Sequence, residues 1–227
     1  MQPALTGFIL IGGTALTMHI GHRISEDLDF ITTNPKLPRA SLTALVKILE
    51  RRGFTVVRDD DPILYDEFIN DGLDLHDYHQ RLLVDGVKVD FFTPDPDFVG
   101  MMEPLNDPLP RVASLHELFR TKALASATRS LSRDWIDLYV LFRQHGFSLA
   151  DFNDVFQRAA VHDPSQRISR AFQNLCRGVA SPTDPGYETL MGNAPSLSEL
   201  AAFFKTMRDT YEIQQATEAF RKSQGSA

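Results

Sequence analysis

The sequence predicts an α+β fold, in which a mixed sheet with helices is followed by a C-terminal helical domain. Up to about residue 110, short apolar runs such as FILI and VKVDFF lie between turn residues, as strands do. An Asp-Gly pair between RLLV and VKVDFF is typical of a two-residue hairpin. After residue 110, apolar residues recur at helical spacing. We therefore expect an α/β domain over residues 1–110 and a helical domain over residues 111–227.

Composition limits the classes of protein that the chain can belong to. Its 227 residues are 43% hydrophobic, which is enough for a sizeable core. The single cysteine, Cys176, excludes an internal disulfide framework and a cysteine-rich zinc site, and we expect it to be buried. A net charge of −7 argues against broad, non-specific nucleic-acid binding but leaves room for a local basic groove. With neither a signal peptide nor a long apolar run, we expect no membrane span and a cytoplasmic location.

The first half is predicted to alternate helices and strands. A short helix is expected in TALTMHIGHR and a strand in SEDLDFIT. The segment from Arg39 to Gly53 has a clear amphipathic pattern, and Gly53 is a good end for this helix. The strand FTVVRD follows, and the acidic segment RDDDPILYDE is interpreted as a solvated turn. The segment TPDPDFVGMMEPLNDPLP is expected to be a connector.

The second half is predicted to be almost entirely helical. Ser114 with Glu117 three residues later fits a capping box at the start of its first helix. The helical patterns are SLHELFRTKALASATRS, SRDWIDLYVLFRQHG, FSLADFNDVFQRAAVHD, SQRISRAFQNLCRGV and SLSELAAFFKTMRDTYEIQQATEAFRKSQ.

Two aspartates stand in the middle of a predicted strand. Residues two apart in a strand point to the same face, so Asp27 and Asp29 present their carboxylates side by side. A buried pair of like charges needs a compensating cation, and oxygen ligands suit Mg²⁺. Asp90 lies in a second apolar run and can join them if the two strands are neighbours. Three carboxylates holding two Mg²⁺ ions is an arrangement used for phosphoryl or nucleotidyl transfer. The alternative is a strand with one solvated face.

A glycine pair precedes these acids. Gly12 and Gly13 would allow backbone N–H groups at a helix N-terminus to approach a triphosphate. The hydroxyl of Thr14 would add a further contact.

The combination of GGTAL, HRISEDLDF and VKVDFF resembles the nucleotidyltransferase fold shared with DNA polymerase beta. More closely, it resembles the AbiEii/AbiGii-type toxin family. The similarity covers residues 8–32, 84–93 and 114–142. The residues that match the first motif are Gly12, Gly13, Thr14, Arg23, Ser25, Asp27 and Asp29. The residues that match a later lysine and an R-D-x-x-D element are Lys122, Arg129, Arg133, Asp134 and Asp137.

The resemblance implies a nucleotidyltransferase-like domain that moves a nucleotide from a nucleoside triphosphate to an acceptor. Asp27 and Asp29 would hold the metal ions, and Asp90 would help to activate the attacking hydroxyl. Lys122 would neutralise phosphate charge, and Arg23 would contact phosphate. RNA, including tRNA, is the acceptor that the resemblance favours, and an antitoxin protein is an implied partner.

Alternatives remain open at this point. If one helix runs through Lys122, Arg129, Arg133 and Asp137, these residues share a face, and the last two could form a surface ion pair. The acceptor could be a small molecule, as in antibiotic-modifying nucleotidyltransferases, or the chain could be an inactive interaction protein on the same fold. His76 and His79 have a spacing that suits zinc, but they lack a third ligand nearby, and a polar loop or hairpin edge is the alternative.

Overall fold

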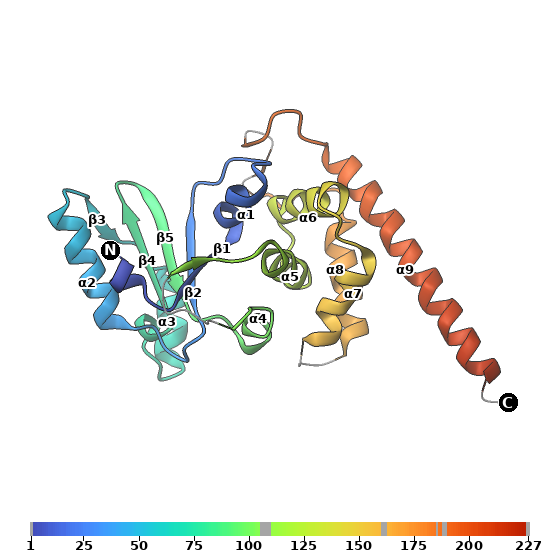
Figure 1. Cartoon of the computed structure of the whole chain (residues 1–227), viewed down its shortest axis with the longest axis horizontal. Helices are drawn as coiled ribbons and strands as arrows, with labels where there is room; N and C mark the ends of the chain where they lie inside the picture. Colours follow the sequence, from blue (N-terminus) through green and yellow to red (C-terminus); the bar gives the residue numbers. More distant parts are fainter. Residues whose placement is uncertain (1, 105–109, 160–162, 185, 188–189, 226–227) are drawn as a thin grey trace. The chain divides into compact units, whose positions relative to one another are not determined.

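The computed structural model describes residues 2–104, 110–159, 163–184, 186–187 and 190–225 (Figure 1). The chain divides into two compact units, Met1–Leu118 and Phe119–Ala227, and the division falls inside helix α5 (Leu115–Ser126). The first unit combines a sheet with helices, and the second is built from helices. The predicted fold class is therefore confirmed.

The sheet of the first unit has six strands in the order β3-β4-β5-β2-β1-β6. It is mixed, because β2 pairs with β5 and β1 with β6 in parallel, whereas the other neighbours are antiparallel. The parallel pairing of β2 with β5 joins the two predicted acid-bearing strands. The strands are β1 (Phe8–Ile11), β2 (Leu28–Thr32), β3 (Val56–Arg58), β4 (His79–Val84), β5 (Val87–Phe92) and β6 (Arg111–Val112).

The hairpin between β4 and β5 turns at the predicted Asp-Gly pair. Asp85 has φ 48° and Gly86 has φ 83°, so both turn residues are left-handed, as a tight two-residue turn requires. This turn pairs Val84 with Val87 and, three steps along, Arg81 with Asp90. The hairpin prediction is confirmed, and the turn determines which side chain stands beside Asp90.

Helix α2 (Arg39–Arg51) covers an apolar core on the sheet, together with the short helix η1 (Gln2–Leu5). Leu42 and Leu45 of α2 are buried, in agreement with the amphipathic pattern of this segment. Phe91 of β5 packs edge-on against Phe8 of β1 and is stacked with Phe30 of β2, each at 5.3 Å between ring centroids. These contacts stabilise the centre of the sheet, where the predicted site lies.

The prediction of a turn in the acidic segment 58–67 is wrong, because helix α3 (Pro62–Asn70) begins there. Asp61 is its N-cap, and its side chain accepts a hydrogen bond of 2.9 Å from the backbone N–H of Ile63. Pro62 occupies the first helical position, where the lack of an N–H costs nothing. The acid before the proline is therefore a start signal for a helix.

The predicted connector, residues 93–110, contains helix α4 (Pro96–Val99), and residues 105–109 lie outside the described residues. Buried Glu117 links the connector to α5. Its carboxylate accepts hydrogen bonds from the Arg111 guanidinium at 2.7 Å, from the Ser114 backbone at 2.6 Å and from the Glu103 backbone at 2.6 Å. The backbone N–H of Glu117 bonds to the Ser114 hydroxyl at 3.3 Å, which confirms the capping box.

Replacing Glu117 with glutamine is expected to lower the free energy of unfolding at neutral pH by about 1.5–3 kcal/mol, because charge-assisted hydrogen bonds are lost. Burial raises the pKa of Glu117, but its bonds to Arg111 and the backbone outweigh burial and hold its pKa below the ordinary 4.5. This stabilisation is present above pH 4.5 and is lost as the pH falls through the folded-state pKa. Urea titrations at several pH values measure the free energy of unfolding. Between pH 7 and pH 3 this free energy should fall less for Glu117→Gln than for Glu218→Gln, a control change at an exposed position. Equal falls would contradict the stabilising role of the Glu117 carboxylate.

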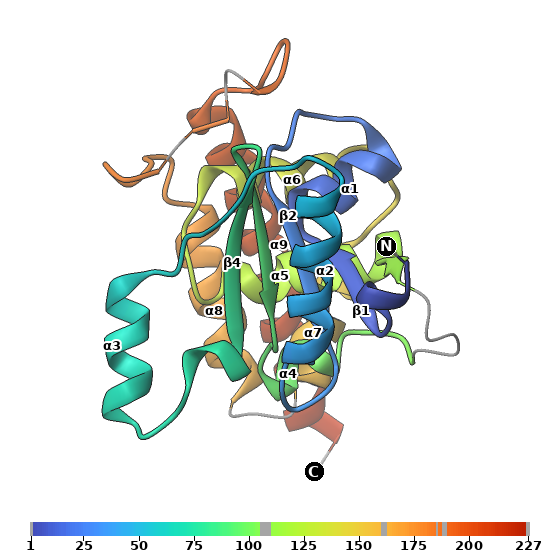
Figure 2. The same ribbon diagram turned by 90° about the vertical axis from the view of Figure 1, so that its left-hand side faces the viewer.

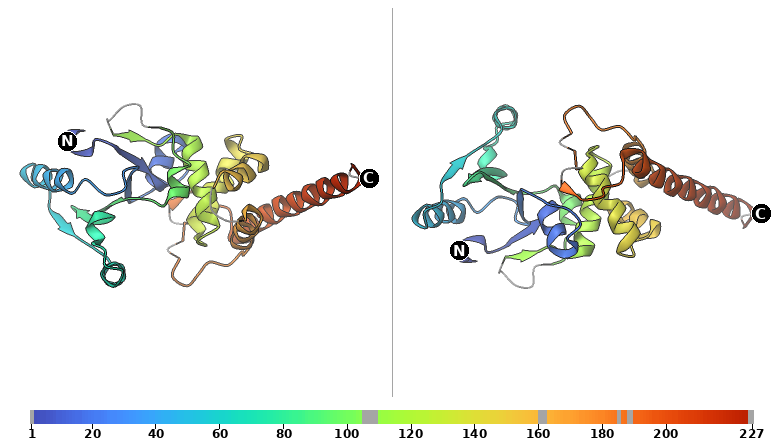
Figure 3. Two further views of the ribbon diagram at one scale, coloured as in Figure 1. Left: turned by 90° about the horizontal axis from the view of Figure 1, so that it is seen from below. Right: turned by 90° about the horizontal axis from the view of Figure 1, so that it is seen from above.

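The second unit has a core of aromatic side chains, among them buried Trp135, Phe152, Phe156 and Phe204. Figure 3 shows α9 as one long helix. No described helix combines the length and apolar character that crossing a membrane requires. Besides the end of α5, the helices are α6 (Ser132–Gln144), α7 (Leu149–Arg158), α8 (Pro164–Leu175) and α9 (Leu197–Gly225).

Lys122 and Asp137 lie on two separate helices, as the two helical patterns predicted, so the alternative of one continuous helix is excluded. Helix α5 ends at Ser126 and α6 begins at Ser132. Asp184 accepts hydrogen bonds from the backbone N–H of Ser132 at 2.6 Å and from its hydroxyl at 2.8 Å, so this carboxylate caps the start of α6.

Candidate active site

Asp29 and Asp90 stand opposite one another on neighbouring strands. In the parallel pairing of β2 with β5, Asp29 and Asp90 are register partners. On the other side of β2, Asp29 pairs with Ile11, the last residue of β1. The sheet therefore places these two predicted metal ligands together, directly beside the point where β1 enters helix α1 (Gly12–Ile20).

Gly12 leaves room for the carboxylate of Asp29. It has φ +75°, and a Cβ atom built there would lie 2.2 Å from Oδ2 of Asp29. A Cβ on Gly13 would lie 2.6 Å from Nη2 of Arg23 and 2.7 Å from the hydroxyl oxygen of Ser25. The glycine pair thus permits the strand carboxylate and the segment of Arg23 and Ser25 to approach the N-terminus of α1.

Hydrogen bonds hold the segment between α1 and β2 against the helix. The Thr14 hydroxyl donates to the carbonyl oxygen of Asp27, and the Thr17 hydroxyl donates to that of Arg23 at 2.9 Å. Arg23 is buried, and its Nη1 donates to the carbonyl oxygen of Ile24 at 3.0 Å. Thr14, Arg23 and Ser25 are therefore brought together around the start of α1, and Thr14 and Arg23 also fix the backbone there.

Asp90 is anchored by two side chains of β4. Nε2 of His79 lies 2.8 Å and Nε of Arg81 lies 2.9 Å from the same oxygen, Oδ1 of Asp90. Burial raises the pKa of Asp90, but the two hydrogen bonds outweigh it, so its pKa lies below the ordinary 3.8. A carboxylate held in this way stays anionic at neutral pH and suits a cation better than it suits the role of a proton acceptor.

Asp27 precedes the first residue of β2 and pairs with Nζ of Lys88 at 2.8 Å. Within the described residues, no three His, Cys, Asp or Glu side chains are arranged as a metal site as they stand. These carboxylates nevertheless fit Mg²⁺, because the strand register brings Asp29 and Asp90 together. Both side-chain bonds to Asp90 use Oδ1, which leaves Oδ2 for a metal ion. At Asp27, a metal ion can replace the partly exposed ammonium of Lys88.

The sequence interpretation missed Arg81 and Lys88 and gave His79 a different candidate role. The signal was available, because a two-residue turn at Asp-Gly fixes the hairpin register and so places Arg81 opposite Asp90. His79 is two residues from Arg81, so it shares the same face of β4.

A second cluster of predicted residues lies in the helical unit. Lys122 of α5 is buried, and its Nζ lies 2.6 Å from Asp134 and 2.7 Å from Asp137, both on α6. Arg129 also pairs with Asp134 at 2.7 Å, and its side chain is 54% exposed. Burial lowers the pKa of Lys122, but the two carboxylates outweigh burial and raise it. Arg133 points elsewhere, since its Nε donates to the carbonyl oxygen of Gly186 at 2.9 Å.

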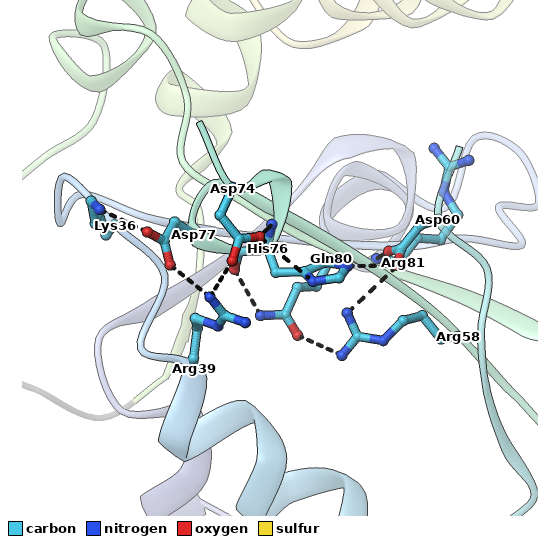
Figure 4. A network of polar contacts seen from close by, with 9 residues as sticks. All are labelled: Lys36, Arg39, Arg58, Asp60, Asp74, His76, Asp77, Gln80 and Arg81. Atoms are coloured by element: carbon cyan, nitrogen blue, oxygen red, sulfur yellow. Dashed lines mark hydrogen bonds and ion pairs between the residues drawn. The ribbon is translucent and has the colours of Figure 1, made fainter. Parts of the chain in front are cut away.

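The remaining candidates have other partners. Nε2 of His76 lies 2.8 Å from Asp60, and Arg58 approaches Asp60 to 3.5 Å (Figure 4). His76 thus belongs to this polar network, whereas His79 bonds to Asp90. Cys176 is buried as expected, and burial raises the pKa of its thiol.

A glycine turn at a helix start beside paired carboxylates on neighbouring strands is the arrangement that the sequence predicts for a nucleotidyltransferase. The chain belongs to the family described as "Nucleotidyl transferase AbiEii toxin, Type IV TA system", whose model matches residues 2–222. The predicted family is therefore confirmed.

Two known proteins are similar to parts of the chain. "Uncharacterized protein aq_aa25" of Aquifex aeolicus (strain VF5) is 30% identical over 151 residues, which is 66% of this chain and 65% of that protein. The chain thus spans slightly less than two thirds of this relative. The crystal structure of the Megavirus polyadenylate synthase is similar with a TM-score of 0.40 and 15% identity, over 63% of this chain and 29% of that one.

Proposed function

We propose that the protein transfers a nucleotide from a nucleoside triphosphate to a hydroxyl group of RNA, with tRNA included among the acceptors, in a reaction that depends on divalent metal. The acceptor oxygen would bond to the α-phosphorus, and pyrophosphate would leave. Family membership supports the reaction class. The observation that carries the proposal is the register of Asp29 with Asp90 beside Gly12, because it brings two carboxylates to the start of a helix.

The carboxylates of Asp27, Asp29 and Asp90 would hold Mg²⁺, with two ions expected. When bound, Mg²⁺ supplies positive charge that neutralises phosphate oxygens and orients them for displacement. His79 and Arg81 would keep Asp90 ionised and fixed in orientation, because both bond to its Oδ1.

The start of α1 is the proposed contact for the triphosphate. Helix N-termini attract phosphate through their unpaired backbone N–H groups, and glycine allows close approach. Gly12 and Gly13 begin this helix, with Thr14, Arg23 and Ser25 around it. Buried Arg23 would add positive charge close to these N–H groups.

For the cluster of the second unit we propose a contact with nucleotide phosphate as well. Arg129 is its most exposed cation, so it is the member best able to reach a ligand. Lys122, Asp134 and Asp137 would fix the position of Arg129. Arg133, whose Nε bonds to the carbonyl oxygen of Gly186, would bind phosphate through its other N–H groups.

The biological role that we propose is that of a cytoplasmic toxin controlled by an antitoxin partner. Family membership supports this role. Small-molecule acceptors, as in antibiotic-modifying enzymes, and an inactive interaction protein on the same fold are the competing functions. The complete set of acids, Asp27, Asp29 and Asp90, favours catalysis over an inactive fold.

Incubation of the purified chain with each labelled nucleoside triphosphate, Mg²⁺ and total bacterial RNA tests this function. We expect label to enter RNA and to disappear when EDTA is added. Label on a small molecule or a protein but not on RNA would refute the proposal that RNA is the acceptor. Neither transfer nor nucleotide binding with any triphosphate would favour the inactive interaction protein.

A further inference from the structure

The ammonium group of Lys88 lies at the proposed metal site. Its Nζ is 2.8 Å from Oδ2 of Asp27, and each of the two side chains is 35% exposed. Lys88 precedes Asp90 by two residues on β5, so these two side chains point to the same face of the sheet. The ammonium is therefore held on the face that carries the proposed metal ligands.

The strands beside Lys88 have one apolar face and one polar face. Val89, between Lys88 and Asp90, belongs to the core that α2 covers, and Leu28 packs against the same core. In Figure 2, α2 lies in front of the sheet on this apolar side. The alternate side chains, Lys88 and Asp90, point away from α2. Lys88 therefore belongs to the polar face, where its contact with Asp27 is electrostatic.

The pair of Lys88 with Asp27 can be exchanged for a metal ion. An ion pair between partly exposed side chains contributes little to stability, so it is easily broken. A divalent cation at Asp27 would carry twice the charge of the ammonium and would repel it. Without another anion nearby, the displaced ammonium would return to water, and its lost contact with Asp27 would count against metal binding.

A bound triphosphate would provide that other anion. Two residues of extended chain span about 7 Å, which is the separation expected between Asp27 and Asp29. The carboxylate of Asp29 approaches Gly12 at the start of α1, where the triphosphate is proposed to bind. Lysine carries its ammonium on a flexible four-carbon stem with three donors. Lys88 can therefore move from Asp27 to a phosphate oxygen by rotation of its own side chain.

We propose that Lys88 makes metal binding at this site depend on the triphosphate. In the free protein, its ammonium occupies Asp27 and lowers the affinity of the site for a lone divalent cation. When metal and triphosphate are both present, Asp27 binds the ion and Lys88 binds a phosphate oxygen. The two ligands then bind with positive coupling, which is equal in both directions. This inference rests on the proposed function, because it concerns the same site.

The test is Mn²⁺ binding by Lys88→Met, measured by electron paramagnetic resonance with and without a non-hydrolysable triphosphate. Methionine keeps an unbranched stem but removes the charge. We expect Lys88→Met to bind lone Mn²⁺ about tenfold more tightly than the wild type, because the ammonium no longer competes for Asp27. With triphosphate present, it should bind the complex about tenfold more weakly, because one phosphate contact is lost.

Two further variants separate this role from the effect of net charge. Lys36→Met removes a lysine of the same unit that pairs with Asp77 at 2.7 Å, and both affinities should stay at the wild-type value. Lys88→Arg keeps the charge, so it should restore the weak binding of lone Mn²⁺.

Equal shifts in Lys36→Met and Lys88→Met would overturn the proposal, because Mn²⁺ would then respond to net charge alone. Lone Mn²⁺ binding that is unchanged or weaker in Lys88→Met would overturn it too, as would unchanged binding of the complex. In these outcomes the wild type still binds Mn²⁺ with triphosphate, so the proposed function stands. A wild type that binds no Mn²⁺ even with triphosphate would refute the metal site itself, and this inference with it.

Discussion

Asp29→Asn is expected to abolish nucleotide transfer while the protein stays folded. Asparagine has nearly the same shape, so it fits beside Gly12, but it removes the negative charge that would bind a divalent cation at the strand register shared with Asp90. Loss of one preorganised electrostatic contact typically costs about 10²–10³ in rate. We expect at least that loss in a labelled-triphosphate assay, with an unchanged melting temperature.

The matched control is Asp66→Asn, which removes a charge from an exposed position of α3 in the same unit. It should retain the wild-type transfer rate. Retained turnover in Asp29→Asn would refute the metal assignment, and equal losses in both variants would point to net charge instead.

Lys122→Ala is expected to destabilise the protein strongly. The change would leave the buried carboxylates of Asp134 and Asp137 without the ammonium that lies 2.6 and 2.7 Å away. Breaking a buried ion pair by removing one partner typically costs about 3–5 kcal/mol. Chemical denaturation should show a loss of this size, besides any loss of nucleotide binding.

Lys205→Ala is the control, because Lys205 is an exposed lysine of α9 in the same unit. Its free energy of unfolding should change by less than about 0.5 kcal/mol. A loss in Lys122→Ala as small as that of the control would contradict the buried ion-pair geometry. Weaker triphosphate binding at unchanged stability would then give Lys122 a role in binding alone.

Parts of the fold that depend on local chemistry could be predicted from the sequence. The Asp-Gly pair specifies a tight turn, and the turn specifies the pairing of Arg81 with Asp90. Ser114 and Glu117 cap a helix through contacts three residues apart. In both cases the residues that determine the structure are neighbours along the chain.

Other parts depend on residues that are distant in sequence. The cap on α6 comes from Asp184, 52 residues after Ser132, so the contact that fixes the start of this helix cannot be predicted from neighbouring residues. The acidic run before α3 hides its helix start for another reason. Its repeated aspartates favour a solvated turn, whereas Asp61 followed by Pro62 begins a helix.

The candidate site was predictable in its residue types but not in its contacts. Alternation along a strand and the glycine pair pointed to Asp27, Asp29 and Gly12. The parallel pairing of β2 with β5 joins segments about 60 residues apart, and local pattern cannot fix such a register. The burial of Lys122 between two carboxylates of α6 is likewise a tertiary feature.

The proposed site requires Asp29 and Asp90 to act together as ligands of a divalent cation. The most direct test is the binding of Mn²⁺, a paramagnetic substitute for Mg²⁺, measured by electron paramagnetic resonance with a non-hydrolysable triphosphate present. We predict that the wild type and Asp66→Asn bind Mn²⁺ and that Asp29→Asn and Asp90→Asn bind it far more weakly. Equal Mn²⁺ binding by all four proteins would contradict the proposed site.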